Sequence, residues 1–413
     1  MITQLTQLLV PMTARSGLLR ALSRRAKCDL MRCGAAAEFL NKKKKLLAEL
    51  SYQPVFKHTY STRNDDVEFG LVAGAGVSWA DGPMLRLKRR VVLHWDQGRP
   101  ETILIVKKAG DAAAAHKLKQ IGSWLVKHEI SVLVERSVAL NGEFPEFDAY
   151  DPESHSVQLA ITLGGDGTVL HLASLFSQDA PLPPVLSFAM GTLGFLTPFN
   201  ASMAHTVLSR LLWPPWEGEP VFATLRSRKH CEVYWDGKLQ RVHRVLNECT
   251  VDRGASPSVV VLECFVDGRH VTTVNADALI ISTPSGSTAY SMSAGGPMVA
   301  PSVPCTILTP VAPHSLSFRP LVVPETSVIE IHIPESSQKR SHAARASFDG
   351  RHTLHVRPGA SIVCKTSQFA LPMINMHPLD EDWYEGITAK LKWTGSLRNQ
   401  QPGAAGQYPG GRY

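Results

Sequence analysis

Residues 159–176 read LAITLGGDGTVLHLASLF, which predicts a buried strand, a glycine-rich turn and a helix. The first residues are apolar or β-branched, and the apolar residues after the turn recur at helical spacing. The glycines would allow a sharp turn and let a ligand approach the main chain, where the first amides of the helix face an anion. Asp166 is unexpected there, because an acid repels phosphate unless it handles a metal ion or takes a proton. We therefore predict a site for phosphate chemistry; the alternative is an ordinary glycine-rich turn.

The neighbouring segments predict a parallel α/β sheet. A strand, a helix with an apolar stripe and a second strand follow one another at 101–108, 111–128 and 130–136. This order forms a βαβ unit. Ligands of such sheets bind beyond the carboxyl ends of the strands, where GGDGT (164–168) and GTLGF (191–195) both fall. We expect a Rossmann-like α/β domain over residues 101–212.

The pattern changes after LLWPPWEGEP, where short β-rich runs alternate with turn signals such as DG, RG and PG. This predicts an all-β sandwich domain over residues 213–375. Residues 376–395 predict a final helix that packs back on the first domain. Residues 396–413 lack the apolar content for a core and predict a disordered tail. Residues 46–100 form an N-terminal extension without a clear pattern.

The overall composition is that of a globular protein, with 44% hydrophobic and 19% charged residues. No apolar run approaches the length of a membrane span. The net charge of +7 comes partly from the N-terminus and the KKKK run at 42–45, without interleaved aromatic residues. We therefore expect neither a nucleic-acid nor a membrane partner. Seven cysteines, none in a CxxC pair, favour a reducing compartment and argue against a structural zinc site.

The N-terminus has the composition of a targeting segment. The first 28 residues contain no acid, and basic residues are interleaved with hydroxyl residues and leucines. On a helix, Leu18 and Leu22 would share one face, with Arg20 and Arg24 roughly opposite. This predicts a mitochondrial presequence, and hence the mitochondrial matrix; the alternative is a disordered basic tail. We leave residues 1–45 out of the expected fold.

Two further stretches are rich in polar groups. LNECTVDR (246–253) places Asn247 and Glu248 at the start of a strand, where a plain polar strand edge is the alternative. In DALIISTPSGSTAYSMSAGGP (277–297) a buried strand opens into hydroxyls, glycines and a tyrosine. Such a loop offers many short donors with little bulk, which suits a sugar and its phosphates. A flexible serine linker is the alternative, but the apolar run before it argues otherwise.

The order GGDGT, LNE, D…STPSGSTAYS…AGGP, TPVAPHSLSFRP and SFDG resembles the NAD kinase family over roughly residues 100–375. GGDGT alone is shared with diacylglycerol-kinase-like and phosphofructokinase-like enzymes, whereas its combination with STPSGSTAY is specific. PPVLSFAMGTLGFLTPF, SLSFRPLVVP and DEDWYEGI are similar to fungal mitochondrial NADH kinases. The resemblance implies an α/β domain followed by a β-sandwich domain, with the site between them.

The resemblance also implies a reaction: the γ-phosphoryl group of ATP, carried with Mg²⁺, passes to the 2′-hydroxyl of the adenosine ribose of NADH or NAD⁺. Asp166 would be the general base or a metal-handling acid, and no metal ligand is predicted. The turn facing the phosphates would be Gly165, Gly167 and Thr168, and His171 occupies a position where relatives often carry a basic or aromatic residue. The residues expected to bind the dinucleotide are Asn247 and Glu248 (ribose and adenine), Asp277 (nicotinamide side or a ribose hydroxyl), and Thr288, Ala289, Tyr290 and Ser293 (groove). A homo-oligomer is expected because relatives self-associate.

The leading hypothesis is therefore an ATP-dependent NAD(H) kinase that prefers NADH and works in mitochondria. A cytosolic NAD⁺-preferring kinase of the same family is one alternative. A lipid kinase with GGDGT is another, but it has no obvious use for the STPSGSTAY loop. A non-catalytic dinucleotide sensor is disfavoured because Asp166 is retained. A dehydrogenase is disfavoured because no GxGxxG with a downstream acid lies in a suitable βαβ unit.

Overall fold

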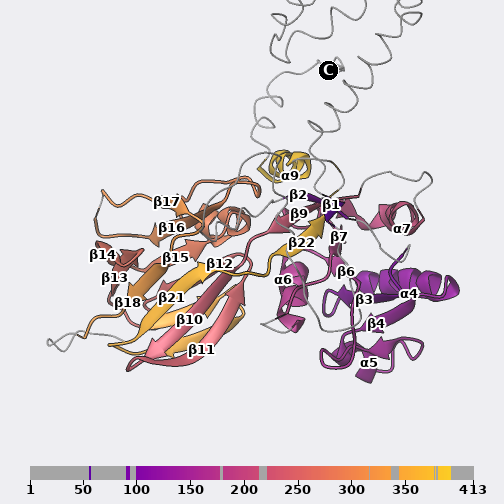
Figure 1. The fold of residues 1–413 in the computed structure, drawn as a ribbon, viewed down its shortest axis with the longest axis horizontal. Helices are drawn as coiled ribbons and strands as arrows, with labels where there is room; N and C mark the ends of the chain where they lie inside the picture. Colours follow the sequence, from indigo (N-terminus) through magenta and orange to yellow (C-terminus); the bar gives the residue numbers. More distant parts are fainter. Residues whose placement is uncertain are drawn as a thin grey trace, which may run out of the picture. The chain divides into compact units, whose positions relative to one another are not determined.

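Figure 1 shows the computed structural model of the chain, in which residues from Val55 onward form one compact unit. The structure describes residues 55–56, 90–93, 99–176, 180–213, 221–315, 317–335, 344–375, 377 and 380–391. The predicted presequence, most of the predicted extension 46–100 and the predicted tail 396–413 lie outside the described residues. Within the described ranges, no helix is both long enough and apolar enough to cross a bilayer.

The α/β domain has the predicted βαβ order. Its central parallel strands run in the order β4-β3-β6-β7, with β5 at the edge beside β4. The elements are β3 (Thr102–Lys107), α4 (Ala112–Lys127), β4 (Ser131–Val134), α5 (Arg136–Leu140), β5 (Asp148–Ala149), β6 (Leu159–Gly164), α6 (Asp166–Leu175), β7 (Val185–Ala189), β8 (Phe199–Asn200) and α7 (Ala204–Leu212). The predicted Rossmann-like domain is thus confirmed.

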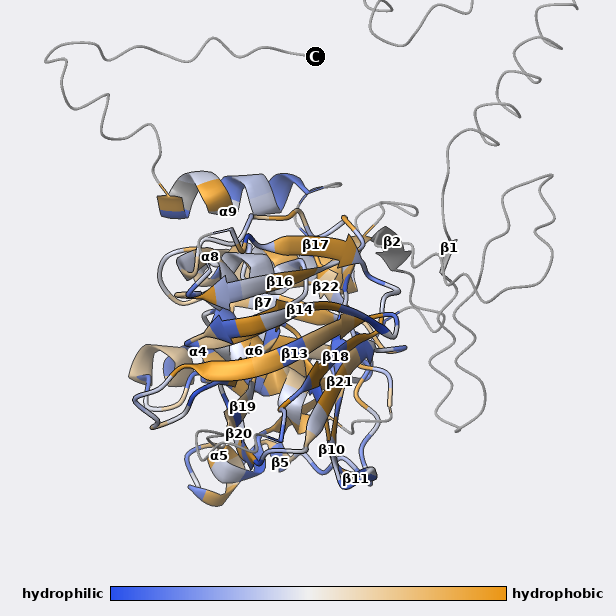
Figure 2. Ribbon diagram, turned by 90° about the vertical axis from the view of Figure 1, so that its left-hand side faces the viewer, coloured by the Kyte–Doolittle hydropathy of each residue, from blue (hydrophilic) through white to orange (hydrophobic). Residues whose placement is uncertain are grey.

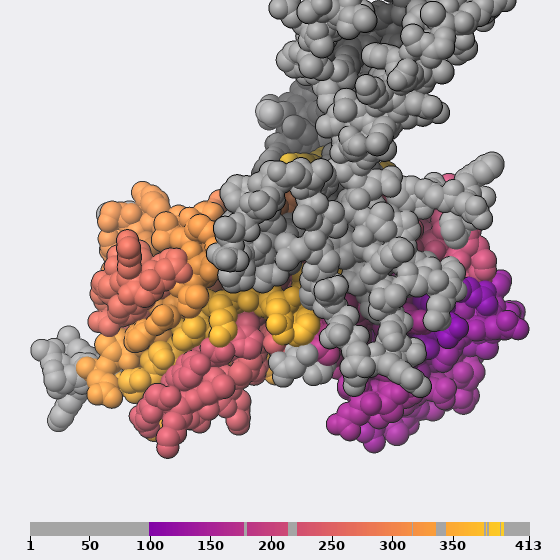
Figure 3. All heavy atoms as spheres, viewed as in Figure 1, coloured from indigo at the N-terminus to yellow at the C-terminus, as the bar shows by residue number. Residues whose placement is uncertain are grey.

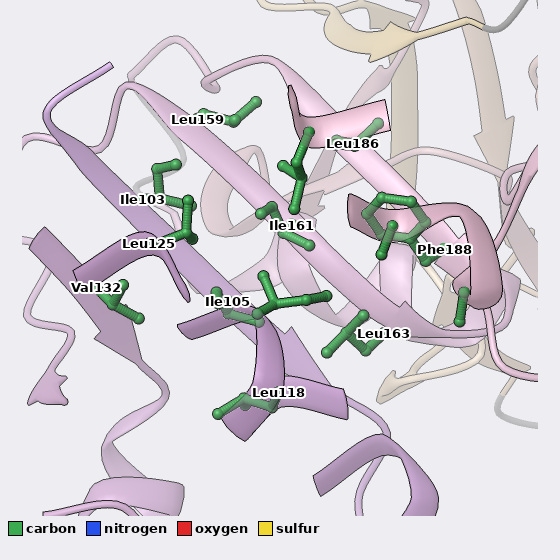
Figure 4. Close-up of a cluster of buried hydrophobic side chains, with 14 of the residues drawn as sticks. Ile103, Ile105, Leu118, Leu125, Val132, Leu159, Ile161, Leu163, Leu186 and Phe188 are labelled. Atoms are coloured by element: carbon green, nitrogen blue, oxygen red, sulfur yellow. The ribbon is translucent and has the colours of Figure 1, made fainter. Parts of the chain in front are cut away.

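Helix α4 shows why this part of the chain folds locally as predicted. The Asp111 carboxylate accepts hydrogen bonds from the first amides of the helix and caps it. Leu118 and Leu125 lie on its buried face at helical spacing. Figure 4 shows them against strand residues such as Ile105 and Ile161, which are fully buried. Burying four aliphatic side chains of this size contributes on the order of 1.5–3 kcal/mol each.

The domain boundary differs from the prediction. Strands β9 (Val221–Arg226) and β22 (Leu371–Ile374), expected in the sandwich, instead extend the α/β sheet. β22 pairs with β7 in parallel and with β9 antiparallel, and β2 (Arg90–Leu93) and β1 (Val55–Phe56) follow beyond β9. The predicted limits 213–375 were therefore wrong at both ends. A short apolar run shows that a strand forms but not which sheet it joins, because that depends on partners far away in the chain.

The remaining strands form the predicted sandwich of two six-stranded antiparallel sheets. One has the order β11-β10-β21-β18-β13-β14 and the other β17-β16-β15-β12-β19-β20. Their bounds are β10 (Lys229–Trp235), β11 (Lys238–Val245), β12 (Glu248–Asp252), β13 (Val260–Val266), β14 (Arg269–Ala276), β15 (Ala278–Ser282), β16 (Cys305–Val311), β17 (Leu321–Pro324), β18 (Ile329–His332), β19 (Ala344–Phe348), β20 (His352–Val356) and β21 (Ser361–Thr366). Figure 2 shows the mixed polar and apolar colouring of these strands, as expected for sheets with one buried face. In Figure 3 the segment near residue 365 lies beside the segment near 230, which are β21 and β10.

Three cysteines that are scattered in the sequence meet inside the sandwich. Cys231 and Cys364 lie opposite each other on β10 and β21, and Cys249 faces them from the other sheet. Their sulfur atoms all lie within 4.8 Å of one another, and all three are buried and free. The spacing of these residues in the sequence does not predict this cluster.

Candidate functional site

A cavity opens at the carboxyl ends of β3, β4 and β6, where the sequence placed a ligand site. Its volume is about 720 Å³, within the range of nucleotide and cofactor sites. Gly165, Gly167 and Thr168 of the predicted turn line it. The polar and charged side chains around them include Lys107, Lys108, Glu135, Asn141, His171 and Arg351. Three cationic residues beside the first turn of a helix form a site for an anion.

The glycines of the turn leave the main chain open, as expected, but the turn itself does not require glycine. None of Gly164, Gly165 and Gly167 has a positive φ, so the turn does not need the conformational freedom of glycine. A Cβ atom at Gly165 or Gly167 would meet nothing within 4 Å, whereas one at Gly164 would lie 2.1 Å from the Thr168 hydroxyl. Gly165 and Gly167 therefore leave the main chain open toward the cavity. Gly164 allows the end of the strand to pack closely on the helix.

Arg351 and His171 join the two domains at this cavity. The Arg351 guanidinium donates to the Gly167 carbonyl at 3.0 Å and approaches His171 Nδ1 at 2.8 Å. Because arginine can only donate, Nδ1 accepts, and the Nε2–H of a neutral His171 donates to Glu135 at 3.0 Å. His171 is thus held in one tautomer by partners from the sandwich and from the end of β4.

The Asp166 side chain points to a second loop, GTLGF. Its Oδ1 accepts from the Leu196 amide at 3.0 Å, and its Oδ2 accepts from the Phe195 amide at 3.1 Å. The Lys390 ammonium donates to Oδ2 at 3.1 Å. A Cβ atom at Gly194 would lie 1.9 Å from Oδ1, so the loop reaches the carboxylate only because residue 194 is glycine. The two glycine-rich motifs therefore meet as predicted, and Asp166 is partly exposed beside the cavity.

Asn247 and Glu248 present unpaired oxygen atoms in a buried position. Asn247 Oδ1 and Glu248 Oε2 are buried and have no hydrogen-bond partner among the described residues. Burial, together with the nearby Asp349 charge, raises the pKa of Glu248 to about 8. Buried polar atoms are nearly always paired, so unpaired oxygens on two consecutive residues indicate the place of a ligand.

Asp349 holds this pair in place. It begins the three-residue loop between Phe348 of β19 and His352 of β20. Asp349 and Gly350 both have positive φ, as the central residues of a type I′ turn do, and the Arg351 amide closes this turn by donating to the Phe348 carbonyl at 3.0 Å. Its carboxylate accepts hydrogen bonds from the amides of residues 246, 247 and 248 at 2.8, 2.8 and 3.1 Å. Burial raises the pKa of Asp349, an effect that these amides oppose. The SFDG motif is therefore the support of the LNE turn.

The STPSGSTAY loop lies directly on the same turn. It forms the 3-10 helix η3 (Ser285–Thr288) and the short helix α8 (Tyr290–Ser293). The Thr283 amide donates to the Asn247 carbonyl at 2.9 Å. A Cβ atom at Gly286 would lie 2.2 Å from that carbonyl oxygen. The predicted groove residues Thr288, Ala289, Tyr290 and Ser293 follow this contact at the surface, where they are half-buried or exposed.

Comparison with known proteins decides the family. Residues 103–214 match the family model of the ATP-NAD kinase N-terminal domain, and residues 246–376 match that of the ATP-NAD kinase C-terminal domain. The chain belongs to the NAD kinase family. This confirms the resemblance seen in GGDGT and STPSGSTAY.

Several members of the NAD kinase family are similar over most of the described chain. A mitochondrial NADH kinase of Schizosaccharomyces pombe is 36% identical, over 73% of this chain and 77% of its own. The putative NAD kinase 3 of Oryza sativa subsp. japonica is 38% identical, over 76% of this chain and 65% of its own. The match covers only 31% of the chloroplastic NAD kinase 2 of Arabidopsis thaliana. This chain thus spans less than two thirds of the length of these two plant relatives.

Two solved structures of NAD kinase family members share the fold. Yeast NADH kinase complexed with NADH has a TM-score of 0.68 and 29% identity, covering 74% of this chain and 91% of its own. The NAD kinase from Archaeoglobus fulgidus in complex with ATP has a TM-score of 0.52 and 23% identity, which shows the fold alone. The predicted fold class, an α/β domain with a β-sandwich domain, is confirmed.

One residue carried over from the NAD kinase family lies away from the others. Asp277 lies just before β15, and the STPSGSTAY loop begins at the other end of this strand. At roughly 3.3 Å per residue, Asp277 and the start of the loop are about 20 Å apart. The Asp277 carboxylate accepts from the Arg253 guanidinium at 2.9 Å. Within this chain it is not brought together with Asn247 and Glu248.

Several residues of the candidate site were not predicted from the sequence. Arg351 directly follows the SFDG motif, and Asp349 lies inside it, but neither was assigned a role. Lys107 and Lys108 end a predicted strand at the ligand edge of the sheet, which was a usable signal. Lys390 has no such signal, because only the tertiary fold brings residue 390 to residue 166.

Proposed function

We propose that this chain transfers the γ-phosphoryl group of ATP to the 2′-hydroxyl of the adenosine ribose of NAD(H). Membership of the NAD kinase family supports an ATP-dependent NAD(H) kinase. The observation that carries the proposal is the Asp166 carboxylate, held by the amides of a second loop and flanked by two glycines that line the cationic cavity. An acid in this position can accept a proton beside a phosphate site.

The cavity is the proposed place of the ATP phosphates. Lys107, Lys108 and Arg351 offer positive charge, and the amides at the start of α6 face the same space. Magnesium enters with ATP as part of the substrate and neutralises phosphate charge. The protein contributes alignment and charge, which is most of what phosphoryl transfer requires.

The buried oxygens of Asn247 and Glu248 are the proposed contacts for the adenosine part of the acceptor. A hydroxyl or amino group of the dinucleotide would satisfy them. In the reaction, the acceptor's 2′-oxygen forms the new bond to the γ-phosphorus while the bond from that phosphorus to the bridging β-phosphate oxygen breaks. Asp166 takes the hydroxyl proton, and the electron pair of the broken bond leaves with ADP.

NADH as the preferred acceptor and the mitochondrial matrix as the location are further parts of the proposal. Similarity to the mitochondrial NADH kinase of S. pombe supports both, and similarity to yeast NADH kinase supports NADH as the acceptor. The basic, acid-free N-terminus also supports mitochondrial import. Self-association, which the family resemblance of the sequence implies, belongs to the same proposal.

The experiment is the Asp166→Asn substitution in the full chain, assayed with MgATP and either NADH or NAD⁺ as acceptor. We expect turnover to fall by at least about a hundredfold, because the proton acceptor is lost, while dinucleotide binding persists. Asp148→Asn, at an exposed position on β5, is the control and should keep normal turnover. Near-normal turnover of the Asp166 variant would contradict the assignment. Phosphorylation of diacylglycerol or sphingosine would favour a lipid kinase, and dinucleotide binding without ATP-dependent product would favour a sensor.

A further inference from the structure

The C-terminal helix α9 (Glu381–Leu391) packs directly on the loop that holds the Asp166 carboxylate. Trp383 and Ile387 are buried in one cluster with Phe195. At Gly386 a Cβ atom would be in ordinary van der Waals contact with the Phe195 ring, at 3.4 Å. Figure 2 shows apolar and polar residues alternating along α9, as this one-sided packing requires.

The N-terminal end of α9 is attached to the proposed dinucleotide-binding region of the sandwich. The Ser302 hydroxyl donates to the Asp380 carboxylate at 2.5 Å, just before the helix begins. Met298 and Ala300, which follow the STPSGSTAY loop, pack against the apolar cluster of α9. The helix therefore touches segments of both domains that border the site.

This packing places the Lys390 ammonium on Asp166. Lys390 Nζ lies 3.1 Å from Asp166 Oδ2 and 4.3 Å from the centre of the Phe195 ring. The carboxylate fixes the ammonium by a charge-assisted hydrogen bond, and the ring face attracts the same cation. Both side chains are about one-third exposed, at 33% for Lys390 and 28% for Asp166, so the pair borders the open site.

We propose that Lys390 is a positioning residue for Asp166, which makes α9 a part of the active site. The inference rests on the proposed function, in which Asp166 accepts the proton of the 2′-hydroxyl. Among the described donors to this carboxylate, backbone amides and the Thr197 hydroxyl are neutral, and Lys390 carries the charge. The ammonium therefore fixes the carboxylate and offsets its charge.

Charge offset answers the question that the GGDGT motif raises. An isolated carboxylate repels phosphate, but a carboxylate paired with an ammonium at 3.1 Å is close to neutral for a phosphate several ångströms away. A hydroxyl that gives its proton to Asp166 Oδ2 would lie within about 3 Å of that atom. Because Lys390 Nζ lies 3.1 Å from the same Oδ2, the ammonium would then be within roughly 6 Å of the reacting oxygen. Its charge is then close enough to favour approach of the transferring phosphoryl group as well.

The test is Lys390→Met, which keeps the apolar stem, compared with Lys390→Arg, which keeps the charge. We expect Lys390→Met to lower kcat by roughly tenfold, the size of one partly exposed charge-assisted contact, with a smaller change in KM for NAD(H). Lys390→Arg should restore part of this loss. Lys119→Met removes the same charge from an exposed position on α4 and should leave kcat unchanged. Trp383 and Ile387 remain to hold the helix, and an unchanged unfolding midpoint verifies it.

A double-mutant comparison separates positioning from a purely structural role. If Lys390 acts through Asp166, adding Lys390→Met to Asp166→Asn should lower the residual turnover by less than twofold. A full tenfold further loss would overturn the inference, because Lys390 would then act independently of Asp166. Wild-type kcat in Lys390→Met would overturn it as well. If Asp166→Asn itself turned over normally, the proposed function would fail first, so the two failures are distinguishable.

Discussion

Replacing Glu248 by glutamine tests whether this buried carboxyl is held for a ligand at the expense of stability. Glu248 is buried, its Oε2 atom has no partner among the described residues, and Asp349 lies nearby. Its pKa is raised from 4.5 to about 8. In the unfolded chain the same carboxyl loses its proton near the ordinary value. Glutamine keeps the shape of the neutral acid without the titration.

The magnitude follows from linkage between proton binding and folding. Between pH 4.5 and about 8, the folded protein keeps a proton on Glu248 that the unfolded chain has released. Stability therefore falls as the pH rises through this window, and the loss is complete above the folded-state pKa. A difference of about 3.5 pKa units at 1.36 kcal/mol each corresponds to roughly 5 kcal/mol. The Glu248→Gln variant lacks this loss. Its free energy of unfolding should therefore exceed that of the wild type by an amount that grows from pH 5 to pH 8 and then levels off.

The assay is urea unfolding of the wild type and the variant at half-unit steps from pH 5 to pH 9. We expect nearly equal free energies of unfolding at pH 5 and a variant more stable by several kcal/mol at pH 8. Glu101→Gln, at an exposed position, is the control and should follow the wild type throughout. Parallel stability curves for wild type and Glu248→Gln would refute the reasoning, since they would show that Glu248 titrates alike in both states.

Two other substitutions test the donor and acceptor sides of the site. Arg351→Gln removes the guanidinium that contacts Gly167 and lines the cavity. We expect it to raise the KM for ATP by about tenfold and to change the KM for NAD(H) little. The control is Arg357→Gln, because Arg357 pairs with Asp236 away from the cavity. An unchanged KM for ATP would place the donor phosphates elsewhere. Gly286→Ala puts a methyl group 2.2 Å from the Asn247 carbonyl oxygen and should lower the free energy of unfolding by about 2 kcal/mol, together with dinucleotide affinity in a titration. Gly191→Ala, where a Cβ atom meets nothing within 4 Å, should be far milder, and equal effects of the two would argue against the close contact.

Much of the fold could be predicted because it depends on local patterns. The apolar run before GGDGT, the capped helix after Asp111 and the alternating runs of the sandwich each favour one element by their own residues. The membership of β9 and β22 in the α/β sheet could not be predicted, because the partners of an apolar strand lie more than a hundred residues away. For the same reason the cluster of Cys231, Cys249 and Cys364 has no signature in the spacing of these residues.

The candidate site likewise combines residues that local patterns predict with residues that only long-range contacts bring together. By itself the sequence determined the residue types on which the predicted chemistry depends, since an acid among glycines and a loop of short hydroxyl side chains are typical of a phosphate and sugar site. Only the tertiary structure decided which charges surround that acid: Arg351 reaches the first turn of α6 across the domain boundary, and Lys390 reaches Asp166 from the C-terminal helix. Electrostatic interactions act through space over a few ångströms, so residues 224 positions apart in the chain become one ion pair only when the whole chain folds.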